Sequence, residues 1–190
     1  VQTCALPICT CRTIHGGAAA TAGGGAGSGG SAGSLRVVVL NVNGLGARNK
    51  RQRLFTFLAA NVFDVVVLVE THSACLSTAS EWLREGAGPG RPWTGEARWA
   101  HGSSSSRGVG VLFREGYPAS QLKVDYSGGD GRVLRVGWRE AAGGRPWAVV
   151  AAYAPNPPAE QARFFGARGP VWAALSAGIA DVEARSEARR

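Results

Sequence analysis

The stretch that decides the fold covers residues 35–72 and reads LRVVVLNVNGLGARNKRQRLFTFLAANVFDVVVLVETH. Two runs of apolar, mostly β-branched residues, 35–40 and 64–70, have the composition of buried strands. Between them, over residues 50–62, apolar side chains recur at helical spacing: Leu54, Phe55, Phe57 and Leu58. A strand, a helix and a second strand with short connections predict a β-α-β crossover unit.

The remainder of the chain is predicted to form mainly short strands. A short helix is predicted over 78–85. After residue 98, five short strands are predicted, over 98–101, 108–114, 121–126, 133–139 and 147–153. Turn compositions at 127–131 and 141–144 separate them. A final helix is predicted from about Pro170, with one apolar stripe: Val171, Trp172, Leu175, Ile179 and Val182. The sum is a mixed α/β sandwich rather than a doubly wound nucleotide-binding sheet.

Composition limits the class of protein. The chain has 190 residues and 45% hydrophobic content, enough for one domain with a core, which excludes wholesale disorder. No run approaches the roughly 18 apolar residues of a bilayer span, so we expect a soluble protein without a membrane partner. With Lys+Arg 21 against Asp+Glu 13, the net charge of +8 favours polyanions such as nucleic acid.

Residues 1–34 are expected to form an unstructured head and linker. Residues 16–34 contain only Gly, Ala, Ser and Thr, which cannot bury enough surface to offset their ordering entropy. Residues 1–8 look derived from a sequencing adapter. Cys9, Cys11 and His15 could suggest zinc, but one residue between the cysteines is fewer than the usual two to four.

The use of cysteine in the predicted domain indicates the cellular compartment. Cys75 is the only thiol in the predicted domain, so no disulfide framework is available. The head also lacks the basic and long apolar regions of a secretory signal. We therefore expect an intracellular protein, cytoplasmic or nuclear.

Three of the predicted strands end in polar residues. The first ends at Asn41 and Asn43, the second at Glu70, and the third at Tyr153 and Asn156. Polar residues that end apolar strands are held at the rim of a sheet, where active sites of α/β proteins are built. We expect the functional site there.

Together these segments carry a family resemblance. Residues 41–45 (NVNGL), the pair Lys50-Arg51, residues 70–72 (ETH), 108–111 (GVGV) and 153–156 (YAPN) resemble, in this order, the endonuclease/exonuclease/phosphatase superfamily. The chain is most similar to the apurinic-like endonuclease domain of LINE-type non-LTR retrotransposon polyproteins. The resemblance runs from Leu35 to about Trp172. It implies a DNase I-like four-layer α/β sandwich, of which residues 35–190 would be the N-terminal portion.

The resemblance also implies roles for single residues. Glu70 matches a Glu that binds a divalent cation, Mg2+ or alternatively Mn2+, and Asn41 matches the metal and phosphate shell. Tyr153 matches a Tyr that supports the scissile phosphate, and Asn156 an Asn that helps to hold the site together. Asn43 stands where exonuclease III-type enzymes carry Asp. The implied partner is DNA, nicked at a target site to prime reverse transcription, without a small-molecule cofactor.

The basic residues that open the predicted helix allow two interpretations. Arg48, Lys50, Arg51 and Arg53 could contact the DNA backbone, or they could form a solvated helix face. Backbone contacts would make DNA binding weaken steeply as salt rises. His72 is expected to be structural or at the surface rather than a general base.

The sequence departs from the family pattern after residue 156. The family continues with a Gly-Asp-Phe/Trp-Asn segment and a closing Ser-Asp-His, and neither occurs in this sequence. Asp181 and Glu183 look like polar positions of the final helix. Because Met is absent too, we expect a fragment without its general base, which is inactive as it stands.

Two alternatives to the endonuclease fragment remain. The first is a catalytically dead remnant with at most weak nucleic-acid binding. The second is a phosphatase or phosphodiesterase acting on lipids or inositol phosphates, which the segment around Tyr153 disfavours.

Overall fold

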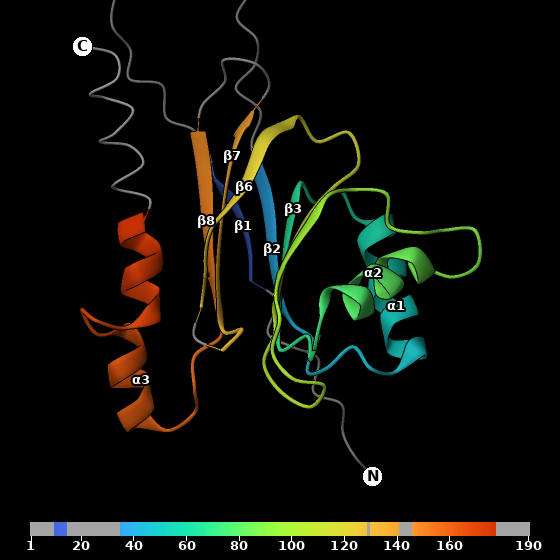
Figure 1. Cartoon of the computed structure of the whole chain (residues 1–190). Coiled ribbons are helices and arrows are strands. Elements are labelled where there is room, and N and C mark those ends of the chain that lie inside the picture. Colours follow the sequence, from blue (N-terminus) through green and yellow to red (C-terminus); the bar gives the residue numbers. More distant parts are fainter. Residues whose placement is uncertain (1–9, 15–34, 129, 141–145, 178–190) are drawn as a thin grey trace, which may run out of the picture.

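The computed structural model describes residues 10–14, 35–128, 130–140 and 146–177 (Figure 1). Its strands are β1 (Thr10–Ile14), β2 (Leu35–Asn41), β3 (Val65–Val69), β4 (Ala97–Ala100), β5 (Val109–Phe113), β6 (Ala119–Gly128), β7 (Val133–Glu140) and β8 (Pro146–Ala152). Its helices are α1 (Arg48–Ala60), α2 (Leu76–Glu85) and α3 (Pro158–Phe165), and residues 170–177 are also helical. The predicted mixed α/β fold is confirmed.

The larger sheet contains the predicted crossover unit. Its five strands lie in the order β1-β2-β3-β5-β4. β2 and β3 pair in parallel, from Val37 opposite Val65 to Asn41 opposite Val69, and α1 connects them. β5 runs antiparallel to β3, so the beginning of β5 lies at the edge where β2 and β3 end.

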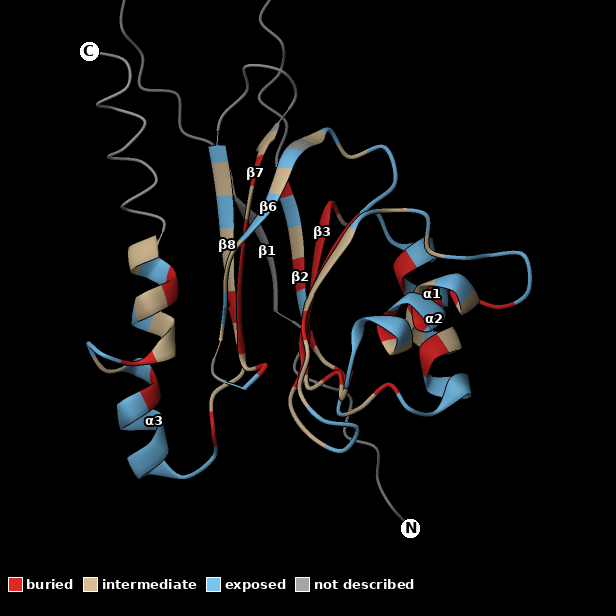
Figure 2. Ribbon diagram, in the orientation of Figure 1, coloured by how far each residue is buried: buried red, intermediate tan, exposed pale blue. Residues whose placement is uncertain are grey.

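The smaller sheet is antiparallel, in the order β6-β7-β8. One hydrophobic core lies between the two sheets and includes Val67, Val111, Phe113 and Trp138. Figure 2 shows the buried residues concentrated on the strands and on the sides of α1 and α2 that face them. The complete four-layer sandwich of the DNase I-like fold stays a prediction.

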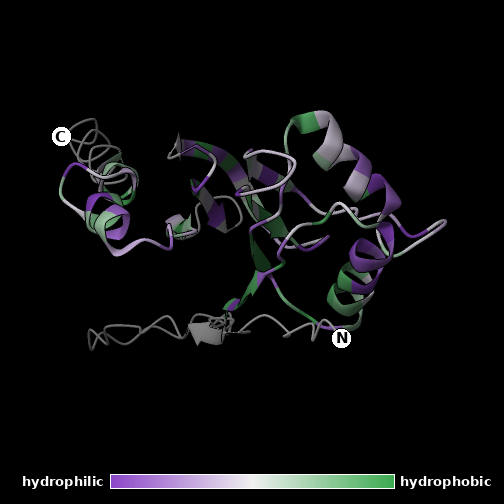
Figure 3. Cartoon of the chain, turned by 90° about the horizontal axis from the view of Figure 1, so that it is seen from below, coloured by the Kyte–Doolittle hydropathy of each residue, from purple (hydrophilic) through white to green (hydrophobic). Residues whose placement is uncertain are grey.

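The outer face of the smaller sheet has its own covering. Helix α3 and helical residues 170–177 lie along this sheet (Figure 1), and Phe164 and Ala174 are buried against Val133. Seen from below, hydrophobic residues gather along the central strands, whereas the helices carry hydrophilic residues as well (Figure 3). Among the described residues, no helix has the length and apolar character needed to cross a bilayer.

The structure differs from the sequence-based expectations at three places. Residues 10–14 were expected in an unstructured head but form β1, which pairs antiparallel with β2. Helix α3 was not predicted, although Pro near its beginning and Glu160 in its first turn are helix-start signals. In the last helix the predicted apolar stripe is not the buried side throughout, because Trp172 and Leu175 are exposed and Ala174 is buried.

Several other expectations lie outside the described residues. These include any role for Cys9 and His15, the linker at 16–34, and the helical positions of Ile179, Asp181, Val182 and Glu183.

Candidate functional site at the edge shared by the two sheets

The two sheets meet at one edge, where the strands with polar ends terminate. The N–H of Gly108, before β5, donates to the carbonyl of Gly131, before β7 (3.2 Å). The N–H of Tyr153, after β8, donates to the carbonyl of Arg132 (2.8 Å). We call this region the Glu70 edge; it comprises residues 41–46, 70–73, 106–108, 130–132 and 153–156. It lies at the lower end of the sheets in Figure 1, and Figure 3 looks onto it.

Glu70 occupies the centre of this edge in an uncommon backbone conformation. Val65, Val67 and Val69 face the core between the sheets, while Val66 and Leu68 face the helices. Strict alternation would turn the next side chain toward the helices. Residue 70 instead has φ 57°, and its carboxylate accepts a hydrogen bond from the hydroxyl of Tyr153, which packs against the inter-sheet core. The left-handed backbone therefore directs the carboxylate to the inter-sheet side.

Tyr153 keeps its proton as a consequence of this contact. The hydrogen bond to Glu70 raises the pKa of Tyr153, and burial and the negative charge of Glu70 raise it further. The guanidinium of Arg132, whose Cζ lies 5.4 Å from the ring centroid, opposes this rise in pKa. Tyr153 is thus a neutral hydrogen-bond donor rather than a base.

The loop after β2 lies beside Glu70. Asn41 has the same parity along β2 as Leu35 and Val37, which places it on the inter-sheet face. Its Oδ1 accepts the N–H of Asn43 (3.0 Å), so the amide is held in place while its oxygen keeps a second lone pair. The N–H of Gly44 donates to the carbonyl of Glu70 (2.6 Å). The ends of β2 and β3 are therefore tied together at the site.

Backbone strain concentrates at this edge. Six described residues other than glycine have positive φ, and five belong to the edge or adjoin it: Asn43, Glu70, His72, Arg107 and Asp130. The sixth, Gln121, lies in β6 at a register irregularity. Strained backbone of this kind costs of order 1–3 kcal/mol per residue and clusters at functional sites. The clustering supports a functional role for the Glu70 edge independently of any motif.

The two histidines of the region have structural contacts. The N–H of His72 donates to the carbonyl of Arg107 (2.8 Å), and the His72 ring lies against Gly44. His101 Nδ1 lies 2.9 Å from the buried Oγ of Ser73, and burial lowers the pKa of His101. Within the described part of the chain, neither histidine forms an ion pair with a carboxylate. A general-base role for either has no geometric support.

The structure separates the basic residues that the sequence grouped together. Arg51 is 7% exposed, and its guanidinium donates to Glu85 (2.5 and 3.0 Å) and to the carbonyls of Leu45 and Gly46. These contacts favour a structural role for Arg51 over a contact with DNA, because its donors are used inside the protein. Lys50 Nζ donates to the carbonyl of Asn43 (2.7 Å) and stays exposed.

Arg48 and Asn156 lie at the periphery. Arg48 is exposed and its Nε lies 3.9 Å from a Glu85 oxygen. Asn156 is exposed, and its carbonyl accepts a hydrogen bond from Gln161 (3.2 Å). No contact between described residues joins the Asn156 side chain to Glu70 or Tyr153, so the structure does not bring it into the site.

The donors at the edge suit a hard cation. Glu70 offers a carboxylate, Asn41 an amide oxygen and Tyr153 a hydroxyl. Mg2+ is bound through one or two carboxylates and keeps several waters, which fits this all-oxygen set. A dedicated cage is not present, since the described residues contain no group of three His, Cys, Asp or Glu side chains that could hold a metal.

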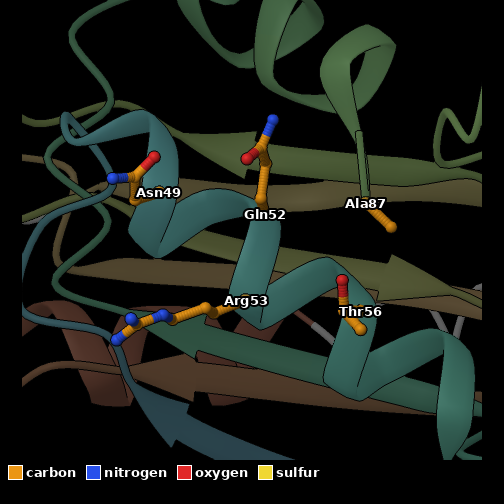
Figure 4. Close-up of a pocket in the computed structure, with 5 residues that line it drawn as sticks. All are labelled: Asn49, Gln52, Arg53, Thr56 and Ala87. Carbon is orange, nitrogen blue, oxygen red and sulfur yellow. The ribbon is translucent and has the colours of Figure 1, made fainter. Parts of the chain in front are cut away.

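A shallow depression lies on another part of the molecule. It is formed on one side of α1, with Ala87 opposite (Figure 4). Its α1 lining residues are Asn49, Gln52, Arg53 and Thr56. None of these residues belongs to the Glu70 edge, so the depression is separate from the candidate site.

Arg107 and Arg132 lie at the Glu70 edge but were not among the residues singled out from the sequence. Both lie directly beside glycines with positive φ, Gly108 and Gly131, at the beginnings of β5 and β7. The sequence feature that could have pointed to these two residues is an arginine next to a turn glycine at the beginning of a predicted strand.

Comparisons with solved structures give partial matches. The AP endonuclease LMAP from Leishmania major is 19% identical and matches with a TM-score of 0.49 over 64% of this chain and 40% of its own. TDP2 from Caenorhabditis elegans is 12% identical, with a TM-score of 0.45 over 82% and 43%. A truncated form of that TDP2 is 11% identical, with a TM-score of 0.44 over 65% and 47%. The chain thus spans less than half of each of these proteins. No family model and no curated protein matches the chain.

Proposed function

We propose that residues 35–190 are the N-terminal portion of a Mg2+-dependent endonuclease domain that hydrolyses DNA phosphodiester bonds. The observation that carries this proposal is the contact between Glu70 and Tyr153 across the two sheets. This contact joins the carboxylate and the phenol that the sequence motifs place in the active site of such an endonuclease. Net charge of +8 is compatible with a polyanionic substrate.

In this proposal, different side chains bind the cation and the phosphate. Glu70 and Asn41 would hold the cation, Mg2+ or alternatively Mn2+. A bound divalent cation neutralises charge on the phosphate and on the leaving oxygen. Tyr153 keeps its proton, and on substrate binding its single hydroxyl hydrogen would turn from Glu70 to a phosphate oxygen, while Lys50 adds positive charge beside Asn43. Positioned donors of this kind stabilise the charge that develops in the transition state.

The biological setting proposed is target-site nicking by a LINE-type non-LTR retrotransposon. This proposal rests on the order of the motifs around Asn41, Glu70, Gly108 and Tyr153, and on Asn at position 43. The nick would prime reverse transcription. DNA is the proposed partner.

We further propose that the 190-residue chain does not hydrolyse DNA efficiently. At the Glu70 edge, Asp130 is paired with Arg107 (3.3 Å), and His72 and His101 have structural contacts. These contacts leave none of the three side chains free to activate water, and a general base contributes typically 100 to 10,000-fold. A second candidate follows from the same observation, namely a catalytically inactive remnant that binds nucleic acid weakly.

Cation binding tests the proposal without requiring activity. Mn2+ added to the 15N-labelled chain should broaden the amide signals of residues 41–44 and 70–72 before others, and Glu70→Gln should abolish the selective broadening. Glu81→Gln, which removes an exposed carboxylate on α2, is the matched control. Uniform broadening, or broadening that survives Glu70→Gln, would contradict a cation site at this edge.

An assay for nicking of supercoiled plasmid in Mg2+ distinguishes an active enzyme from the two candidates, the inactive endonuclease fragment and the inactive remnant. We expect no conversion above that of a buffer control. Conversion that disappears in Glu70→Ala would show that the chain itself is catalytically competent.

A further inference from the structure

Arg132 differs from the other basic residues near the Glu70 edge. Arg51 is bound to Glu85, Arg107 is paired with Asp130, and Lys50 donates to a carbonyl. The guanidinium of Arg132 instead lies over the ring of Tyr153, 5.4 Å from its centroid. Among the described residues, no carboxylate lies within ion-pair distance of it. Its charge is thus held beside the site without being neutralised by a carboxylate.

The backbone around Arg132 is rigidly placed. Gly131 has φ 80°, and a Cβ there would lie 2.1 Å from the carbonyl oxygen of His101, so the turn accepts only glycine. The Gly131 carbonyl accepts the N–H of Gly108 (3.2 Å), and the Arg132 carbonyl accepts that of Tyr153 (2.8 Å). The start of β7 is therefore fixed against the larger sheet on one side and against β8 on the other.

The chemistry of a stacked arginine suggests its ligand. A guanidinium that lies over an aromatic face keeps its N–H groups available at its edge, in a planar arrangement that matches two oxygens of a phosphate. The ring beneath it belongs to Tyr153, whose hydroxyl meets Glu70. A phosphate held by Arg132 would therefore lie next to the proposed cation site.

We propose that Arg132 is a substrate-binding residue that contacts a phosphodiester of nucleic acid adjacent to Glu70. This inference rests on the proposed function and names the contact through which the site holds its substrate. Arg132 binds and orients the phosphate, while the cation site at Glu70 is separate from it.

The test compares three variants in binding to a fluorescein-labelled 14-base-pair DNA duplex, measured by anisotropy at several salt concentrations in Mg2+. Arg132→Gln should weaken binding about tenfold and reduce the slope of log K against log salt by about 1. Arg132→Lys keeps the charge and should retain the slope, but it should bind about threefold more weakly because an ammonium cannot make the bidentate contact. Circular dichroism verifies that each variant is folded.

Arg36→Gln is the matched control. It removes the same charge at the beginning of β2, about 16 Å along the strand from Asn41, and it should leave Kd within twofold of the unmodified chain. Equal weakening by Arg132→Gln and Arg36→Gln would show only a general electrostatic effect and would overturn the inference. Unchanged Kd in Arg132→Gln would overturn it as well, although the proposed function would stand.

A second probe distinguishes failure of this inference from failure of the proposed function. Dimethyl phosphate, titrated into the unmodified chain, should shift the Nε–Hε signal of Arg132 in 15N NMR. If DNA does not bind but this signal shifts, the phosphodiester contact stands and the DNA substrate is wrong. If neither probe has an effect, both proposals are overturned.

Discussion

The hydroxyl of Tyr153 and the carboxylate of Glu70 form a hydrogen bond that joins the ends of β8 and β3, strands of different sheets. This contact depends on the left-handed backbone of Glu70, which has φ 57°. It places a negative charge, a neutral donor and the guanidinium of Arg132 around one point of the Glu70 edge.

The first prediction concerns the ionisation of Tyr153. The pKa of Tyr153 should lie above the ordinary value near 10. Glu70→Gln should lower this pKa, because it removes both the charged acceptor and the repulsion of the phenolate. Arg132→Gln should raise it further, since the guanidinium favours the charged form. NMR titration of 13Cζ-labelled tyrosine measures both shifts, with the signal of Tyr126 in β6 as internal control. Shifts of the same sign in the two variants would contradict the arrangement.

The second prediction concerns the structural role of Arg51. Its removal leaves two loop carbonyls without their donor and leaves Glu85 only the longer contact with Arg48 (3.9 Å), and loss of such a largely buried charged hydrogen-bond network costs about 3 kcal/mol. Arg51→Gln should lower the free energy of unfolding by about that amount in urea titrations followed by circular dichroism. Arg53→Gln, on the exposed side of the same helix, should change it by less than about 0.5 kcal/mol. Similar effects of the two substitutions would contradict a structural role specific to Arg51.

The third prediction concerns the pH dependence of this ion pair. The hydrogen bond from Arg51 lowers the pKa of Glu85. A carboxyl whose folded pKa is lowered stabilises the protein above its unfolded pKa, about 4.3 for Glu, and loses this effect as the pH falls through the folded value. The difference in free energy of unfolding between the unmodified chain and Glu85→Gln should therefore be largest near pH 7 and shrink below about pH 4. A difference that is constant from pH 7 to pH 3 would rule this out.

The fourth prediction compares two glycines of the loop after β2. Gly44 has φ 79°, and a Cβ there would lie 2.6 Å from Nδ1 of His72, whereas a Cβ at Gly46 would meet nothing within 4 Å. Gly44→Ala should therefore destabilise the fold by about 1–3 kcal/mol and displace the His72 ring. Gly46→Ala should be close to neutral. Chemical denaturation gives the stability, and the His72 ring signals in NMR report the displacement. Equal effects would mean that the loop does not pack as described.

The fifth prediction concerns Cys75, which is exposed and precedes α2. Hydrogen bonds with the hydroxyls of Ser77 (3.0 Å) and Thr78 (3.3 Å) lower its pKa to about 7. Its rate of alkylation by iodoacetamide, followed by mass spectrometry of the Cys75 peptide, should therefore reach half of its maximum near pH 7. Ser77→Ala should move this midpoint upward, toward the value of about 8.5 for a free thiol. Ser80→Ala, further along the same helix, is the control and should leave the midpoint in place.

The predicted elements were those whose signal is local. The runs at 35–40 and 64–70 are dense in Val and Leu, and both form strands of the predicted crossover unit. Helix α3 has eight residues and buries only Phe164, so it offered no apolar periodicity to detect. Strand β1 is stabilised by pairing with β2, and a short polar segment carries no sign of a distant partner.

The sequence predicted which residues form the candidate site better than it predicted how they are arranged. Glu70, Asn41 and Tyr153 end apolar strands, which the sequence shows directly. Arg51 and Arg132 could not be told apart in the same way. Arg51 lies next to the site loop in sequence, yet Glu85 from α2 binds its guanidinium. Arg132 is remote in sequence from Glu70, and the pairing of β7 with β8 brings it over the ring of Tyr153, whose hydroxyl meets Glu70.

The sequence by itself determined strands β2 to β8, the crossover helix and the polar residues that end three of the strands, because apolar periodicity and turn composition depend on neighbours along the chain. Only the tertiary structure decided where the charged side chains point. The carboxylate of Glu70 turns toward Tyr153 through one left-handed residue, and the guanidinium of Arg51 is held by Glu85. Both outcomes depend on partners from other elements, whose proximity arises only when the two sheets and their helices pack together.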